Sequence, residues 1–106
     1  MKEISIEKLK DNPQSVIFSA SWCKPCQNLK LQFKDVDFPY IYHDSDEKEI
    51  DKWLDENNLN VRSYPTVLEY HNNKYSIANM HAHQYLFLIK RNNQMKEYVE
   101  FTEIKN

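Results

Sequence analysis

Cys23 and Cys26 are the only cysteines among the 106 residues, and they lie three positions apart in the run Trp22, Cys23, Lys24, Pro25, Cys26. Cysteines at this spacing are typical of thiol–disulfide exchange, in which a thiolate attacks a disulfide sulfur through a mixed disulfide. A free thiol with a pKa of about 8.5 is mostly protonated at neutral pH. The sequence therefore predicts a redox site that stabilises negative charge on one sulfur.

The residues around the pair place it between a strand and a helix. Ser15 to Ser19 is an apolar run typical of a buried strand. Downstream, apolar side chains recur at helical spacing, and a proline in the first turn forfeits no helical hydrogen bond. The residues with this spacing are Cys26, Leu29, Phe33 and Val36. Cys23 is therefore expected at the start of a helix.

This position favours Cys23 as the attacking sulfur. The helix dipole contributes roughly 0.3–1 kcal/mol, less than the about 1.4 kcal/mol that one pKa unit represents. Other groups must contribute, and the candidates are unpaired first-turn amides, the Cys26 thiol and the Lys24 ammonium. Because Cys26 lies inside the helix, we expect Cys23 to attack and Cys26 to resolve the mixed disulfide. Pro25 would keep the turn stiff.

The rest of the chain alternates between strand and helix patterns. Asp46 and Glu49 are expected to form a capping box, and the helix that follows carries Ile50, Trp53 and Leu54. The other expected elements are an edge strand at Glu3 to Ile6, a helical turn at Glu7 to Asp11, a strand at Tyr40 to Asp44 after a break at Pro39, a hairpin of Thr66 to Tyr70 and Lys74 to Ala78, and a helix with Tyr85, Leu86 and Ile89.

This order of elements predicts one α/β domain over residues 1–106, with a central mixed sheet flanked by helices on both faces. The reactive pair would then lie at the carboxyl end of a strand, where such folds place their chemistry. The tail from Lys96 leaves three options open, because Val99, Phe101 and Ile104 could close the last helix, add an edge strand or contact a partner.

Glycine is absent from the chain. Glycine-rich phosphate loops and dinucleotide fingerprints need backbone positions that only glycine allows, so this absence disfavours a nucleotide enzyme. Asparagine is the next most tolerant residue at positive φ. The pairs Asn57–Asn58, Asn72–Asn73 and Asn92–Asn93 are therefore expected at turns or helix ends.

The composition and net charge limit the kinds of partner that the protein is expected to bind. The chain is 41% hydrophobic and 28% charged, as is typical of a folded soluble protein. Its net charge is −2 with both signs mixed, so nothing recruits it to nucleic acid or to an anionic membrane. Met1 to Asn12 lacks the apolar core of a signal peptide. We expect a cytoplasmic location, where a lone close pair of cysteines is more often catalytic, or half of a metal site, than structural.

The run Trp22 to Cys26 resembles the active-site motif of thioredoxin, whose usual form has glycine at the position of Lys24. The segment Val61 to Thr66 is similar to the family's segment ending in a cis-proline and a threonine, and the element order agrees over nearly the whole chain. The resemblance implies a thioredoxin-like fold. It also implies that Pro65 is cis and packs beside the disulfide, and that the Tyr64 backbone pairs with an extended substrate peptide.

The same resemblance implies an apolar surface of Trp22, Pro25 and Tyr64 that receives the substrate. The substrate-binding residues that it indicates are Trp22, Tyr64, Pro65 and Thr66.

The chain departs from thioredoxins at two positions beside the motif. Ile17 stands where thioredoxins usually carry a buried aspartate, which removes a proton route to the second cysteine. His81, with His83 two residues further on, stands where a glycine near the active site is usual. One hypothesis is that His81 lies near the sulfurs and contributes electrostatic or proton-transfer work. The alternative is an exposed loop histidine.

Other clusters have simpler interpretations. A zinc site could combine the cysteines with two histidines, but no histidine pair has finger-like placement and a proline between the cysteines suits redox chemistry better. No metal is therefore expected at His43, His71, His81 or His83. Core positions are predicted for Phe33, Trp53 and Leu54, and a helix cap and solvated face for Asp44, Asp46 and Glu47.

Together these observations predict a thioredoxin-like protein disulfide reductase that binds no cofactor. It would act as a monomer on protein disulfides and depend on an electron donor resembling thioredoxin reductase. Two alternatives stay open. Lys24 and the missing aspartate suit a more oxidising protein resembling glutaredoxin or a disulfide isomerase, since about 1.4 kcal/mol of extra stabilisation of the reduced form raises the potential by about 30 mV. The other is a protein-binding module with incidental redox activity.

Overall fold

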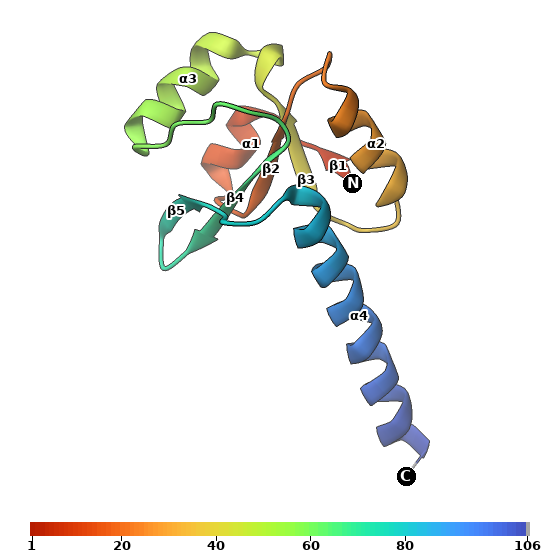
Figure 1. Cartoon of the computed structure of the whole chain (residues 1–106). Coiled ribbons are helices and arrows are strands. Elements are labelled where there is room, and N and C mark those ends of the chain that lie inside the picture. The colour runs from red at the N-terminus through yellow and green to blue at the C-terminus, as the bar shows by residue number, and fades with distance from the viewer. Residues whose placement is uncertain (106) are drawn as a thin grey trace.

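A five-stranded mixed sheet forms the centre of the molecule (Figure 1). The computed structural model describes the backbone of residues 1–105 and the side-chain environments of residues 1–94. In the order β1-β3-β2-β4-β5, β3 pairs in parallel with β1 and β2, and β4 pairs antiparallel with β2 and β5. The strands are β1 (Lys2–Glu3), β2 (Val16–Ser19), β3 (Pro39–Tyr42), β4 (Thr66–His71) and β5 (Lys74–Ile77). The predicted mixed α/β sheet is confirmed.

Helices cover both faces of this sheet. Side chains of β2 alternate, with Val16 and Phe18 facing one apolar cluster and Ile17 facing the other. The first cluster holds residues of α1 (Ile6–Asp11) and α3 (Glu47–Glu56), and the second holds residues of α2 (Lys24–Gln32) and α4 (Ala82–Lys105). Phe33, Trp53 and Leu54 are buried in these clusters, which confirms their predicted core positions.

Several predicted boundaries were wrong, and local hydrogen bonds explain them. The edge strand stops at Glu3 because the Ser5 hydroxyl accepts the Lys8 N–H and begins α1 at Ile6. Helix α2 ends at Gln32, so Val36 lies beyond it, although it is still buried.

The second predicted strand was shifted in the same way. Pro39 does not break the chain but begins β3, a position where proline is tolerated. The strand ends at Tyr42 because His43–Ser45 forms a short 3₁₀ helix, η1. Asp46 is the N-cap of α3, but its side chain makes no capping hydrogen bond, so the predicted capping box is not formed.

Asparagine takes the place of glycine at three positive-φ positions. Asn72 and Asn73, at φ 53° and 61°, form a two-residue turn between the paired residues His71 and Lys74. Asn58 has φ 56° just after α3. Asn92 and Asn93 instead lie within α4, so that part of the prediction was wrong.

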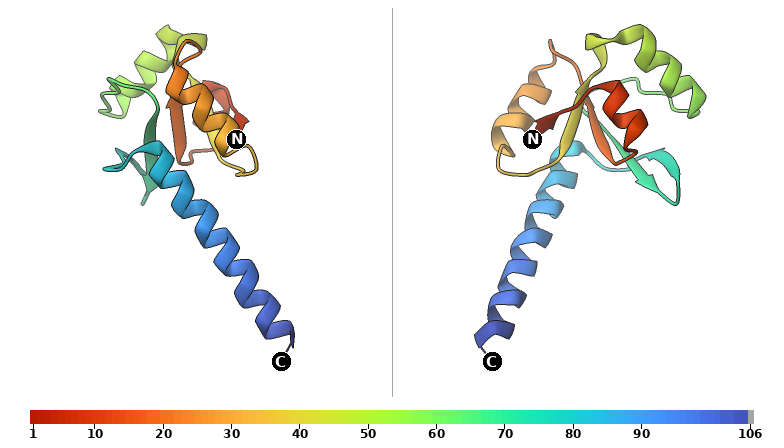
Figure 2. Two further views of the ribbon diagram at one scale, coloured as in Figure 1. Left: turned by 45° about the vertical axis from the view of Figure 1, so that its right-hand side comes forward. Right: turned by 180° about the vertical axis from the view of Figure 1, so that it is seen from behind.

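Helix α4 projects from the body of the molecule (Figure 2), whose extents are 54 × 31 × 23 Å. Ala82 and Leu86 anchor its first turns against the sheet. Of the options for the tail, the backbone follows the helical one and reaches Lys105. The packing of Val99, Phe101 and Ile104 lies outside the described side chains. Within residues 1–105, no helix is both long and apolar enough to span a membrane.

Candidate active site

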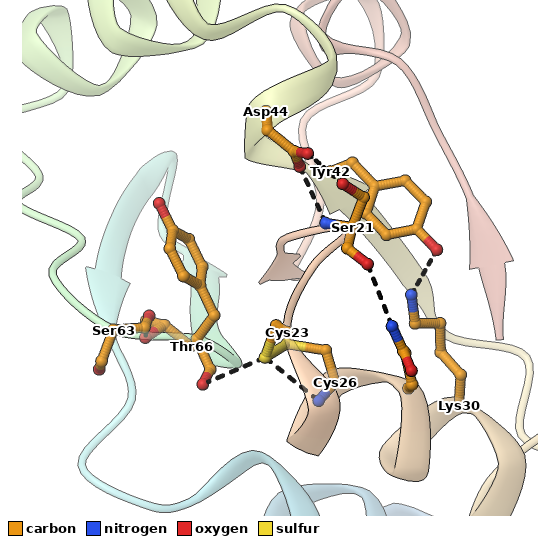
Figure 3. The surroundings of a disulfide bond; sticks show 10 residues. Ser21, Cys23, Cys26, Lys30, Tyr42, Asp44, Ser63 and Thr66 are labelled. Atoms are coloured by element: carbon orange, nitrogen blue, oxygen red, sulfur yellow. Dashed lines mark hydrogen bonds between the residues drawn. A yellow bond between two sulfur atoms is a disulfide. The ribbon is translucent and has the colours of Figure 1, made fainter.

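Cys23 and Cys26 form a disulfide at the N-terminus of α2 (Figure 3), with their Cα atoms 5.3 Å apart. Cys23 is the N-cap residue, and its Sγ accepts a hydrogen bond from the Cys26 N–H at 3.3 Å. Both residues are buried, with exposed fractions of 4% for Cys23 and 1% for Cys26. A sulfur that accepts a first-turn amide at a helix N-terminus is placed to carry negative charge.

Hydrogen bonds hold the loop between β2 and α2, which positions Cys23. The Cys23 N–H donates to the Ala20 carbonyl at 3.1 Å as the chain turns out of β2. The Ser21 N–H donates to Asp44 Oδ1 at 3.0 Å, and its hydroxyl donates to Asp44 Oδ2 (Figure 3). These bonds from Ser21 lower the pKa of Asp44. Asp44 is exposed, as the predicted solvated face requires, but it does not cap α3 and instead anchors the loop before Trp22.

Tyr64 lies beside the disulfide. Its carbonyl oxygen lies 3.6 Å from Cys23 Sγ, and its peptide bond to Pro65 is cis, as the resemblance implied. Trp22 meets the Tyr64 ring edge-on, with centroids 5.8 Å apart, and is 71% exposed. Thr66 begins β4, and its hydroxyl donates to the Ser63 carbonyl at 2.6 Å. The structure therefore gathers Trp22 and the segment before β4 around the sulfurs.

A hydrogen-bonded chain beneath Tyr64, which passes through the buried His43 to the exposed Asp51, was not predicted from the sequence. Tyr64 Oη lies 2.6 Å from His43 Nδ1, and His43 Nε2 lies 2.6 Å from Asp51 Oδ1. The sequence interpretation considered His43 only as a possible zinc ligand. No local motif could reveal this chain, because the Tyr64–His43 bond joins residues 21 positions apart.

His81 does not contact the sulfurs through any hydrogen bond in the described part of the chain. It lines a groove of about 550 Å³ that runs from Pro25 on α2 past Pro65 to Ala82. His83 lines the same groove and packs edge-on against Phe33, with centroids 5.3 Å apart. The role suggested for His81 stays a prediction.

The two remaining departures from the thioredoxin motif differ in their surroundings. Ile17 is fully buried in the apolar cluster under α2, whereas Lys24 is exposed at the first position of that helix. A second lysine, Lys30, ties α2 to β3, since its Nζ donates to Tyr42 Oη at 2.5 Å and lies 4.0 Å from the centroid of that ring (Figure 3).

The histidines considered as zinc ligands are dispersed. His43 bonds Tyr64 and Asp51, His71 ends β4, and His81 and His83 lie at the start of α4. In the part of the chain that the structure describes, no three His, Cys, Asp or Glu side chains are grouped so as to hold a metal ion.

Comparison with solved structures identifies the fold class. No family model matches the chain, and no curated protein matches it. Among solved structures, the Trx4 domain of ERdj5 is similar, with a TM-score of 0.51 and 14% sequence identity over 88% of this chain and 94% of that one. The chain therefore has a thioredoxin-like fold. It carries a Cys-X-X-Cys disulfide at the start of α2, as the motif predicted.

Proposed function

We propose that this protein is a thiol–disulfide oxidoreductase that reduces disulfide bonds in other proteins. The observation that carries the proposal is the position of Cys23 Sγ, which caps α2 and accepts the Cys26 N–H beside the exposed Trp22 ring. A thiolate at this position is stabilised by the amide and by the helix dipole, both of which favour the charged form. Cys23 is therefore the nucleophile.

The reaction proceeds in two exchanges. The Cys23 thiolate attacks one sulfur of the substrate disulfide, which forms a Cys23–substrate bond and expels the other substrate sulfur as a thiolate that takes a proton from water. Cys26 then loses its proton and attacks the Cys23 sulfur. This second exchange releases the remaining substrate thiol and closes the Cys23–Cys26 bond. The substrate gains two electrons and two protons, and a separate dithiol reductase must return them to the protein.

Substrate recognition falls to the surface beside the sulfurs. Trp22 offers an exposed aromatic face, and the segment of Tyr64, Pro65 and Thr66 leads into β4 next to it. An extended peptide can pair with the backbone of such a segment and place its own disulfide against Cys23.

Mixed-disulfide capture tests the proposal. Cys26→Ser leaves the first exchange intact and removes the resolving thiol, so this variant should accumulate covalent complexes with protein disulfides that dithiothreitol releases. Cys23→Ser is the matched control and should capture nothing. Equal capture by the two variants, or reduction of insulin no faster than the background rate, would contradict the proposal.

A more oxidising role is the second candidate, and the exposed Lys24 at the first position of α2 favours it. A cation there stabilises the Cys23 thiolate and therefore the reduced form, which raises the reduction potential. Equilibration with glutathione redox buffers, followed by thiol alkylation, measures that potential directly. A potential near that of thioredoxin would exclude this role.

A protein clamp with incidental redox activity is distinguished by one variant. The double substitution of Cys23→Ser with Cys26→Ser removes all thiol chemistry but leaves the Tyr64 surface in place. Full biological activity of that variant would favour the clamp over the reductase.

A further inference from the structure

A hydrogen-bonded chain runs from Tyr64, beside the disulfide, through the buried His43 to Asp51, whose side chain is 61% exposed. Its two hydrogen bonds are both 2.6 Å long. Tyr64 comes from the segment before β4, His43 from η1 and Asp51 from α3. The chain therefore links three elements that are separated in sequence.

The donor and acceptor roles in this chain follow from Asp51. An ionised carboxylate only accepts hydrogen bonds, so His43 Nε2 carries the proton that is donated to Asp51. In the tautomer that carries its proton on Nε2, Nδ1 is an acceptor and the Tyr64 hydroxyl donates to it. Burial, with the negative charges of Asp51, Glu47 and Asp44, raises the pKa of Tyr64, so the phenol keeps this proton at neutral pH.

His43 is held firmly at the middle of the chain. It is only 8% exposed, and its ring packs edge-on against Phe18, with centroids 5.8 Å apart. Phe18 is fully buried in the central strand β2. A hydrogen bond from His43 therefore fixes its partner relative to the core of the sheet.

That partner, Tyr64, touches both parts of the active surface. Its carbonyl oxygen lies 3.6 Å from Cys23 Sγ, and its ring supports the exposed Trp22 edge-on. A shift of the Tyr64 side chain would therefore move two features together. These are the Trp22 ring that packs against it and the Tyr64 backbone that faces the Cys23 sulfur.

We propose that His43 is a positioning residue for disulfide exchange. It acts through the Tyr64 hydroxyl to hold the segment Tyr64 to Thr66, where the substrate peptide docks, in a fixed position beside the Cys23–Cys26 bond. The proposal rests on the proposed reductase function. It assigns His43 to recognition of extended protein substrates, because a small disulfide can reach Cys23 without pairing with the Tyr64 backbone. His43 itself does not touch the reacting sulfurs.

The test compares two substrates in single-turnover reactions of the pre-reduced protein, followed by alkylation and mass spectrometry. Insulin supplies peptide disulfides, and hydroxyethyl disulfide is a small one. Tyr64→Phe and His43→Leu should each lower the ratio of the insulin rate constant to the small-disulfide rate constant about fivefold, which corresponds to about 1 kcal/mol. The rate constant for hydroxyethyl disulfide should fall by less than that for insulin, because the small substrate does not pair with the Tyr64 backbone.

Two further variants separate positioning from stability. His43→Asn keeps an acceptor near the Nδ1 position and should restore most of the ratio. The double variant His43→Leu with Tyr64→Phe should lower the ratio no more than either single change, because both remove the same hydrogen bond. Tyr64→Phe removes one oxygen atom from a half-buried ring, so it tests the proposal even if His43→Leu does not fold.

Matched controls come from the same elements. Tyr70→Phe removes a hydroxyl that bonds Asn73 on the β4–β5 hairpin, and Asp55→Asn neutralises an exposed carboxylate one turn along α3 from Asp51. Both should leave the ratio unchanged. An unchanged ratio in Tyr64→Phe, equal losses on both substrates, or additive losses in the double variant would overturn the role of His43. A wild-type protein that reduces neither substrate would contradict the reductase function itself.

Discussion

Helices α2 and α3 differ in their N-cap residues and in the charges of their first turns. The difference explains why the N-terminus of α2, and not that of α3, can stabilise a reactive anion. The N-cap of α2 is Cys23, whose sulfur accepts the Cys26 N–H. The N-cap of α3 is Asp46, a residue type that caps helices well, yet its side chain makes no capping bond. Sulfur is a weaker hydrogen-bond acceptor than a carboxylate oxygen, yet of these two N-cap side chains only the Cys23 sulfur caps its helix.

First-turn charges differ in the same direction. Helix α3 has Glu47 and Glu49 in its first turn, and these carboxylates already complement the positive end of the helix dipole. Helix α2 has no acidic residue in its first turn and begins with Lys24. Its dipole and its free amides are therefore left for the two thiols at this helix start, and Cys23 is the one whose sulfur accepts a first-turn N–H.

The largest expected effect comes from replacing that sulfur. Cys23→Ser should reduce insulin turnover to the uncatalysed background, because a hydroxyl does not form a thiolate at neutral pH. Serine is a strong N-cap residue, so the free energy of unfolding should match or exceed that of the reduced wild type in urea titrations. Lost activity together with a large loss of stability would instead indicate that Cys23 is needed for the fold.

Patterns within one element could be predicted from the sequence. The apolar run of β2, the helical spacing after Cys23 and the two asparagines at 72 and 73 each depend on neighbours a few positions away. Each of these elements formed, although α2 ended before Val36. Boundaries failed where a backbone turn decided them. The Ser5 cap and the η1 turn after Tyr42 are examples, because either segment could also have continued as a strand.

Contacts between distant segments could not be predicted. The cysteine motif indicated the sulfurs, and the resemblance to thioredoxin indicated Tyr64 and Pro65. Asp44 looks like an ordinary cap residue in the sequence, and only the fold brings it to Ser21, 23 positions away. His43 likewise shows no signal until β3 ends beside the segment before β4.

Capping energies provide the next prediction. Ser5 makes the bond that Asp46 lacks, since its hydroxyl accepts the Lys8 N–H at 3.1 Å. Ser5→Ala should therefore lower the free energy of unfolding by about 1 kcal/mol, whereas Asp46→Ala should change it by less than about 0.5 kcal/mol. Urea denaturation of both variants measures the difference. A larger loss at Asp46 would show that its carboxylate supports α3 through the dipole alone.

Lys24→Glu makes α2 begin as α3 does, with an acid at its first position. The carboxylate would repel the thiolate and use part of the dipole, so the pKa of Cys23 in the reduced protein should rise by less than about one unit. Thiolate absorbance as a function of pH measures it, and added salt should shrink the shift because Lys24 is exposed. Lys74→Glu makes the same charge change at the distant hairpin and should leave that pKa unaltered.

The smallest expected effect concerns the acids of α3 themselves. The Lys10 ammonium bonds Glu49 at 2.9 Å and holds the pKa of Glu49 below its ordinary value of 4.5. Because the pKa is lower in the folded state, this carboxylate stabilises the protein above pH 4.5 and loses that contribution as the pH falls through the folded pKa. Glu49→Gln should therefore be less stable than the wild type at neutral pH, and the difference should disappear in acid. A difference independent of pH would mean that Glu49 acts by packing rather than by charge, which would leave Glu47 as the only first-turn carboxylate of α3 that complements the helix dipole.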